Sequence, residues 1–219
     1  MTWEVRPMSD FETAWHVEPA GKAGADRVLV LTRGDATVLV VADGAGNSRR
    51  GAEAAEAVLR GVQDAVDAGA DVEREETWRD VLVRCDAERV ASGQGGETTA
   101  LVACVTTRRV VGASVGDSEL WLFQGGESTA LTEHQHRKPL LGSGQARPVT
   151  FELAWRGGVL LGASDGLFKY VDLRRIQEHV SLADANAAVL ALAALPRLAS
   201  GALPDDVGLV LCRPSAPCP

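Results

Sequence analysis

TVLVVADGAG (Thr37–Gly46) and GVLLGASDGLF (Gly158–Phe168) share one pattern, an apolar strand that ends in Asp-Gly. Such a strand holds a carboxylate in a fixed direction, and the glycine after it permits a sharp turn and a close approach by a ligand. Two more acidic sites border strands: Asp117 in SVGDSELWLF, and Asp205-Asp206 before VGLVLC. Four acidic sites that are far apart in the sequence but all border strands predict one divalent-metal site.

Each acidic site also has a simpler interpretation. Asp-Gly is among the commonest turn dipeptides, so either segment alone favours a plain turn, and Asp205-Asp206 alone is compatible with the solvated start of a strand. The combination favours a metal site, because converging carboxylates repel one another unless a cation neutralises them. Mg²⁺ and Mn²⁺ prefer oxygen ligands, and two such ions about 4 Å apart can hold a hydroxide and clamp a phosphoryl group.

Composition narrows the class of protein. The 219 residues are 46% hydrophobic and carry a net charge of −8. We expect one α+β domain over residues 1–219, with a variable segment at 1–20 and a mobile tail at 214–219. The acidic balance argues against a nucleic-acid partner, since phosphate contacts need Lys and Arg. It does not oppose a phosphorylated protein, because metal ions can supply local positive charge.

The sequence offers no signal for secretion or membrane insertion. The N-terminal MTWEVRPMSD has no apolar core, and the apolar stretch ANAAVLALAALP is shorter than the roughly 20 residues needed to cross a bilayer. The four cysteines, Cys85, Cys104, Cys212 and Cys218, form no C-x-x-C pair, and Cys104 and Cys212 lie in apolar strand-like segments. These features predict a cytoplasmic, reduced protein with no membrane partner, which we expect to be a monomer.

The order of predicted elements indicates antiparallel sheets with helices packed outside them, because strands and helices do not alternate regularly. We expect strands at 28–32, 37–42, 98–106, 109–115, 119–123, 149–155, 159–162 and 207–212. We expect helices at 50–68, 74–91, 172–179 and 182–198. Strands 28–32 and 37–42 should form a hairpin, and 149–155 and 159–162 a second pair. Residues 1–27 give no clear pattern, and 131–146 should be a surface flap.

Five segments resemble the metal-dependent protein phosphatases of type 2C, and they stand in the order of that family. VVADGAGN resembles the family's strand with D-G-x-G, and GETTALVACV resembles its G-T-T-A strand. VGDSELWLF is similar to G-D-S-R, LGASDGLFKYV to A-S-D-G followed by an apolar residue, and DDVGLVLC to the closing D-N/D-x-T-V-V strand. The resemblance runs from about Gly21 to Arg213.

The resemblance implies an αββα sandwich, in which two antiparallel sheets carry helices on both outer faces. It implies hydrolysis of phosphoserine and phosphothreonine by a hydroxide held between two Mn²⁺ or Mg²⁺ ions. Asp43 would bridge both ions, Gly44 would offer its carbonyl oxygen to one, and Asp165 and Asp205 would bind the other. Asp43 and Asp165 are the expected catalytic residues. The implied partner is a phosphorylated protein, such as a serine/threonine kinase or one of its targets.

Two further acids are implied at the edge of this site. Asp117 resembles the acid that helps the family hold a weaker, third ion, and Asp26 stands where the family has the Asp of an N-E-D motif. The chain departs from the family pattern around the phosphate: Ala25 replaces Glu, Ala45 replaces a His of some members, Asn47 replaces Gly, His134 replaces Asp, and no Arg stands near Gly21, where Lys22 and Arg27 are the nearest cations.

These departures keep two hypotheses open, an active phosphatase and a non-catalytic, regulatory module that binds phosphoproteins. His134 and His136 could protonate a leaving group, although two exposed polar residues are the favoured interpretation. A basic rim could attract acidic phosphopeptides; its residues are Arg137, Lys138 and Arg147. Arg49 and Arg50 could reach a phosphate, but solvated surface is favoured there, and Ser48 could cap the helix that follows.

Overall fold

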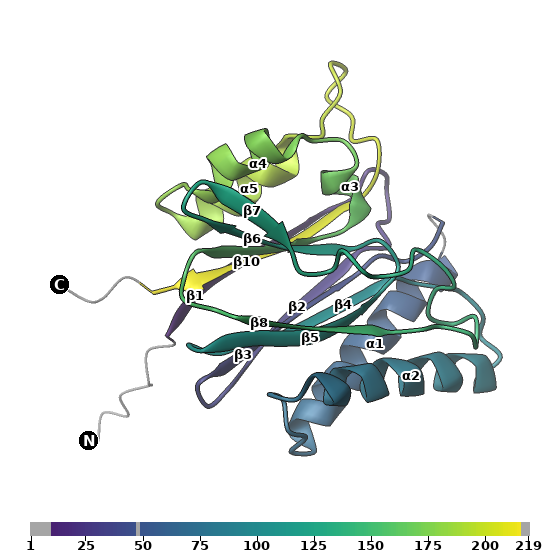
Figure 1. The fold of residues 1–219 in the computed structure, drawn as a ribbon. Coiled ribbons are helices and arrows are strands. Elements are labelled where there is room, and N and C mark those ends of the chain that lie inside the picture. The colour runs from purple at the N-terminus through teal and green to yellow at the C-terminus, as the bar shows by residue number, and fades with distance from the viewer. Residues whose placement is uncertain (1–9, 47–48, 216–219) are drawn as a thin grey trace, which may run out of the picture.

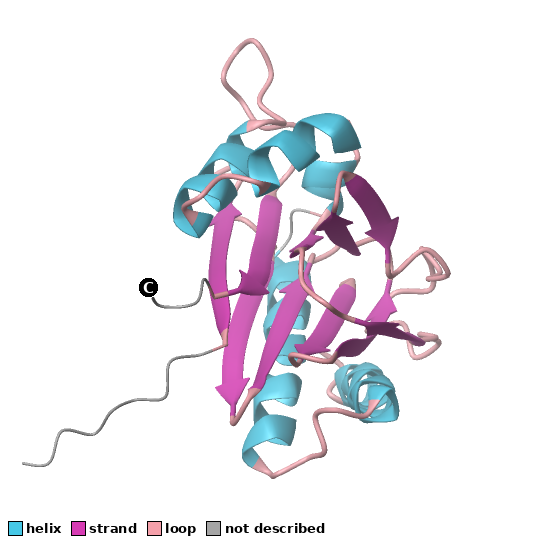
Figure 2. Cartoon of the chain, turned by 60° about the vertical axis from the view of Figure 1, so that its left-hand side comes forward, coloured by secondary structure: helices cyan, strands magenta, loops and turns pink. Residues whose placement is uncertain are grey.

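Strand β3 (Ala36–Ala42) is an interior strand of the fold, and both of its faces are apolar and buried. Val38 and Val40 pack toward a helical layer, whereas Leu39 and Val41 pack toward a second sheet. Successive side chains of a strand point to opposite faces, so a strand apolar on both requires a layer on each side. The computed structural model, which describes residues 10–46 and 49–215, has these layers (Figures 1 and 2).

Two five-stranded sheets form the middle of the molecule, and every neighbouring pair within them is antiparallel. The first has the order β2-β3-β4-β5-β8, with β2 (Arg27–Arg33), β4 (Ala100–Val105), β5 (Arg109–Val115) and β8 (Val149–Ala154). The second has the order β1-β10-β9-β6-β7, with β1 (Phe11–Glu18), β10 (Val207–Pro214), β9 (Val159–Ala163), β6 (Glu119–Gln124) and β7 (Glu127–Ala130).

Helices cover both outer faces (Figure 2). The first sheet is covered by α1 (Arg49–Asp67) and α2 (Glu75–Ala91). The second is covered by α3 (Asp165–Phe168), α4 (Leu173–Val180) and α5 (Ala185–Ala194). A third apolar cluster fills the space between the sheets. The predicted αββα sandwich is therefore confirmed. Within the described residues, no helix is both long enough and apolar enough to cross a membrane.

The two predicted strand pairs had different outcomes. The hairpin is confirmed, since β2 pairs with β3 and Gly34 takes a φ of 58° in the turn between them. The pair 149–155 and 159–162 is wrong: β8 pairs with β5, whereas β9 pairs with β10 and β6. The chain passes from one sheet to the other at Gly157 and Gly158, whose φ values of 111° and 93° suit a sharp turn of either kind.

The ends of the chain also differ from expectation. Residues 11–18, which gave no sequence pattern, form β1 and pair with β10 along its whole length. Pro214 belongs to β10 rather than to a tail, and 216–219 lie outside the described residues. Helix α5 is shorter than the predicted 182–198 at both ends. It starts later because the Asp184 carboxylate accepts hydrogen bonds from the N–H groups of Asn186 and Ala187 and so caps its start.

Candidate metal centre

A cavity of about 620 Å³ opens where strands of both sheets end, and five of the six predicted site residues line it. Asp43 follows β3, Asp165 follows β9 by two residues, and Asp205 precedes β10. Asp117 lies between β5 and β6. The lining also includes Gly44. The structure thus brings together acids that are up to 162 positions apart in the chain, from 43 to 205.

The backbone of Asp43 is fixed by two neighbouring threonines. The Asp43 N–H donates to Thr99 Oγ1 at 2.9 Å, and its carbonyl oxygen accepts from the Thr99 N–H and from Thr98 Oγ1, each at 2.8 Å. A 2.7 Å hydrogen bond joins Thr99 Oγ1 to Ser118 Oγ, beside Asp117. The threonines of GETTA therefore hold two of the acidic segments in register, a role that the sequence did not reveal.

The glycines after Asp43 and Asp165 serve packing. A Cβ on Gly44 would lie 2.4 Å from the carbonyl carbon of Gly51 in α1, and one on Gly166 would lie 1.8 Å from the carbonyl oxygen of Asp206. Neither glycine has a positive φ. The close approach that the structure shows at these glycines is by this chain's own backbone, which lets the acid-bearing segments meet; the predicted close approach of a ligand stays a prediction.

Asp26 does not line the cavity but is buried, with a residue exposure of 1%. Its Oδ2 accepts a 2.6 Å hydrogen bond from Ser164 Oγ, which in turn accepts from the Gly208 N–H at 3.0 Å. Its Oδ1 is buried and has no hydrogen-bond partner among the described residues. Burial raises the pKa of Asp26 to about 6, although the Ser164 hydrogen bond opposes this.

The electrostatics of the cavity favour a bound cation. Burial, followed by the negative charges of Asp26, Asp165 and Asp205, raises the pKa of Asp43 to about 8. Burial and the charges of Asp117 and Asp205 also raise the pKa of Asp165, and Lys169, whose Nζ lies 3.6 Å from Asp165 Oδ2, opposes that shift. Carboxylates whose ionisation is penalised in this way are stabilised when a cation joins them.

The donor set fits Mg²⁺ or Mn²⁺. Every predicted ligand offers oxygen, the atom that hard divalent cations prefer. Within residues 10–46 and 49–215, no group of three or more His, Cys, Asp or Glu side chains is placed to hold a metal ion by itself. A site with fewer than three such side chains in direct contact with the ion is compatible with Mg²⁺, which is usually bound through one or two carboxylates and keeps several waters. The orphaned Oδ1 of Asp26 is a further acceptor close to Asp43.

Adjacent acids in the sequence have different environments. Asp205 lines the cavity, whereas the Asp206 carboxylate is buried and accepts 2.7 Å hydrogen bonds from the N–H groups of Ala20 and Ala25. Asp206 therefore fastens the segment that carries Asp26.

The Asp117 carboxylate already has a hydrogen-bond partner, since its Oδ2 accepts from Arg137 Nε at 3.1 Å and from Arg137 Nη2 at 2.7 Å.

The predicted flap at 131–146 is anchored in the protein. Leu140 and Leu141 are buried, and Thr98 and Leu141 exchange two backbone hydrogen bonds. The Asp86 carboxylate of α2 accepts from the N–H groups of Gly142, Gly144 and Ala146 at 2.7, 2.9 and 3.0 Å. The flap prediction was thus wrong for the second half of the segment, because buried leucines and a buried carboxylate fix it.

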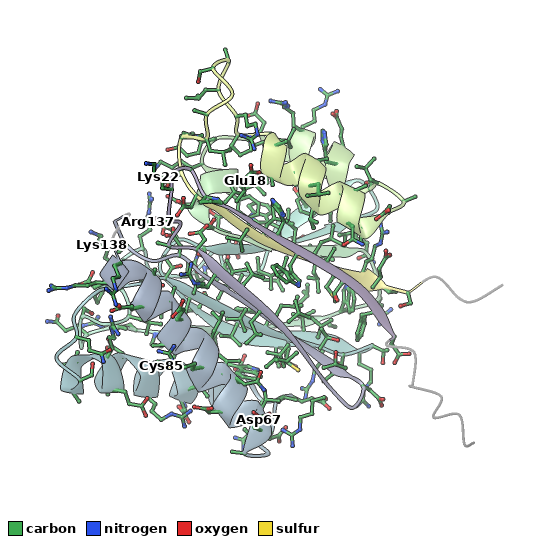
Figure 3. All side chains as sticks on the ribbon, turned by 180° about the vertical axis from the view of Figure 1, so that it is seen from behind. Glu18, Lys22, Asp67, Cys85, Arg137 and Lys138 are labelled. Atoms are coloured by element: carbon green, nitrogen blue, oxygen red, sulfur yellow. The ribbon has the colours of Figure 1, made fainter. Side chains whose placement is uncertain are left out.

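Basic residues of this loop face the acids. Arg137 and Lys138 line the cavity, and they lie at the same end of the molecule as Lys22 in the view of Figure 3. Arg27, the other cation considered for phosphate, is committed elsewhere: its Nε and Nη2 donate to Glu56 Oε1, and its Nη1 donates to the backbone oxygens of residues 24 and 26.

The remaining candidates lie away from the acids. The His134 side chain is 84% exposed beside Glu133, and neither it nor His136 lines the cavity. Arg49 pairs with Glu53 on the exposed face of α1, and Arg50 does not line the cavity. The favoured interpretation of these residues as surface is compatible with this placement. Ser48, predicted as a cap, and Asn47 fall outside the described residues.

The fold and the cavity together define a class of protein, an αββα sandwich with converging carboxylates at the ends of both sheets. Residues 18–141 match a family model described as protein phosphatase 2C. Because this match spans more than half of the 219 residues, the chain belongs to the protein phosphatase 2C family. Among curated proteins, none is significantly similar in sequence.

Solved structures agree on the fold. A crystal structure of a bacterial serine phosphatase that carries an arginine-to-alanine mutation superposes with a TM-score of 0.84 at 21% identity, covering 95% of this chain and 100% of that one. The catalytic domain of the phosphatase PstP with two manganese ions gives 0.80 at 20% identity, over 93% and 97%. Stp1 from Staphylococcus aureus gives 0.81 at 19%, over 99% of each. At such identities the likeness concerns the fold.

Proposed function

We propose that this family member is an active protein serine/threonine phosphatase that depends on Mn²⁺ or Mg²⁺. The observation that carries the proposal is the convergence of Asp43, Asp165 and Asp205 on one cavity, with pKa values raised at the first two. The family match supports the activity. The PstP structure, which contains two manganese ions, supports the choice of metal. We keep the predicted single domain and cytoplasmic location as part of the proposal.

Each acid has a proposed role. Asp43 would contact both ions, the Gly44 carbonyl oxygen one of them, and Asp165 and Asp205 the other, while Asp117 would serve a weaker third ion. When bound, such a pair supplies a water of lowered pKa for attack on phosphorus. The threonine hydrogen bonds keep Asp43 in place, and Asp26 lies buried close to it. These fixed positions reduce the reorganisation needed for reaction.

Arg137 and Lys138 are the proposed contacts for the substrate phosphate. Both line the cavity, and Arg27 is occupied by Glu56. Arg137 offers a planar fork that suits a phosphate, whereas Lys138 acts as a point charge. Binding through Arg137 would require its guanidinium to share or leave the Asp117 carboxylate, which it contacts at 2.7 Å.

Metal-dependent hydrolysis tests the proposal directly. We expect Mn²⁺ to support turnover of p-nitrophenyl phosphate and of a phosphothreonine peptide, and a chelator to remove it. Asp43→Ala and Asp165→Ala should each abolish turnover. Asp35→Ala, which removes an exposed carboxylate from the β2–β3 turn, is the matched control and should keep it. Turnover that survives the chelator would contradict the metal mechanism, and peptide binding without turnover would favour the regulatory module.

A further inference from the structure

A second cavity of about 510 Å³ adjoins the candidate metal centre. The two cavities share three residues, Asp117, Arg137 and Asp165. We call the second one the acidic groove and define it by its other charged, amide and aromatic lining residues: Glu119, Trp121, Glu133, Gln135, Phe168 and Lys169. Because the groove and the metal centre have a common wall, a chain that places one residue in the centre can place its neighbours in the groove.

The charges of the groove are only partly balanced. Asp117 is paired with Arg137, and Asp165 with Lys169. Glu119 has no Lys or Arg partner among the described residues, and its Oε2 accepts a 2.6 Å hydrogen bond from Trp121 Nε1. That bond holds the carboxylate beside the indole ring.

The rest of the groove offers an aromatic face and the side chain of Gln135. The ring centroids of Trp121 and Phe168 lie 6.1 Å apart, with an angle of 34° between the ring planes, and the two rings form an aromatic side of the groove. Gln135 Oε1 is buried without a hydrogen-bond partner among the described residues, while the amide nitrogen of Gln135 donates to the Ser118 carbonyl oxygen.

We infer that the acidic groove binds the residues that flank the phosphorylated serine or threonine and selects those with a basic side chain. This inference rests on the proposed function, and it names the class of substrate. A guanidinium can pair with the Glu119 carboxylate while lying against the Trp121 ring. Acidic flanks meet the negative charge of Glu119 and Glu133, neither of which has a Lys or Arg ion-pair partner among the described residues, and are disfavoured.

Three phosphothreonine hexapeptides test the inference, with Arg, Ala or Glu on both sides of the phosphothreonine and otherwise identical. We expect kcat/KM in Mn²⁺ to be about fivefold higher for the Arg peptide than for the Ala peptide, and lower again for the Glu peptide. The preference should shrink as salt is added, because the groove is open to solvent.

Two variants assign the preference to the groove. Glu119→Gln keeps the acceptor for Trp121 and removes the charge, and Glu133→Gln removes the charge of an exposed residue, so neither should disturb folding. Each should lower the Arg-to-Ala ratio of kcat/KM by about two- to threefold. Glu127→Gln is the matched control: Glu127 is an exposed residue of the same hairpin, outside the groove, and its loss should leave the ratio unchanged.

The outcomes separate this inference from the proposed function. Equal kcat/KM for the Arg and Ala peptides, or a ratio unchanged in both glutamine variants, would overturn the groove assignment while the phosphatase stands. No turnover of any peptide would instead contradict the proposed activity. Calorimetric titration of the Arg and Ala peptides in Mn²⁺ then decides the groove: tighter binding of the Arg peptide by severalfold supports it, and equal binding refutes it.

Discussion

Replacing Asp86 with alanine should release the loop that forms one wall of the candidate metal centre. The Asp86 carboxylate, 6% exposed at the residue level, accepts three backbone hydrogen bonds from the loop over Gly142–Ala146. The same loop brings Arg137, Lys138 and Leu140 to the cavity. The variant thus removes a single side chain in α2 and leaves three N–H groups without their acceptor.

The magnitude follows from these bonds. A hydrogen bond to a charged group contributes about 1.5–3 kcal/mol in favourable cases, but the loop can open and let water satisfy its N–H groups. We therefore assign about 1 kcal/mol to each bond and expect the free energy of unfolding to fall by about 3 kcal/mol. For a protein of this size, each kcal/mol corresponds to about 2–4 °C, so Tm should fall by about 6–12 °C.

The assay is urea unfolding followed by circular dichroism, together with a thermal scan and hydrogen exchange of the loop peptide. Asp86→Asn should show a smaller loss, because its amide oxygen still accepts. Asp80→Ala is the matched control: it also removes a carboxylate from α2, but Asp80 is exposed and pairs with the adjacent Arg79. A loss no larger for Asp86→Ala than for Asp80→Ala, or loop exchange that does not change, would refute the reasoning.

Two further predictions concern packing and buried thiols. Gly166→Ala should destabilise the protein by more than about 3 kcal/mol or prevent folding, because its Cβ would lie 1.8 Å from the Asp206 carbonyl oxygen; unfolding in urea measures this, and near-native stability would contradict it. In a Cys218→Ser background, a thiol reagent at pH 8 should label nothing in the native state and three thiols in denaturant. Burial raises the pKa of the remaining cysteines, to about 11 for Cys85 and about 12 for Cys104 and Cys212. The native thiolate fraction at pH 8 is therefore about one in a thousand or less, and it increases only as the pH rises toward these pKa values. Fast labelling of the native protein would refute the prediction.

The layers of the fold could be predicted because they follow from local patterns. The apolar run of β3 on both faces requires two neighbouring layers, and the order of strands and helices excludes regular βαβ units. The partners of β8 and β9 could not be predicted in the same way. Gly157-Gly158 suits a hairpin as well as a passage between sheets, and only contacts distant in sequence decide between them.

At the site, too, local patterns could be predicted from the sequence and nonlocal contacts could not. Acids at strand ends and their order identified the cavity, since an apolar strand fixes where its last residue lies. The supports of those acids escaped notice because each depends on a nonlocal contact, such as Thr99 with Asp43 or Ser164 with Asp26. One support left a signal: Asp86 follows Trp78 and Leu82 at a spacing of four, which places a carboxylate on the buried face of α2.

Because Arg27 is occupied elsewhere, the proposed activity depends on the loop that Asp86 anchors. Its guanidinium is held by Glu56 and by backbone oxygens next to Asp26, so the segment before β2 helps to build the fold there instead of presenting a cation to the cavity. Among the described residues that line the cavity, the cations are Arg137 and Lys138, and both belong to the loop that Asp86 anchors. If Arg137 and Lys138 bind the substrate phosphate as proposed, phosphate recognition depends on an anchor in α2, and loosening that anchor should raise KM for a phosphopeptide as well as lower Tm.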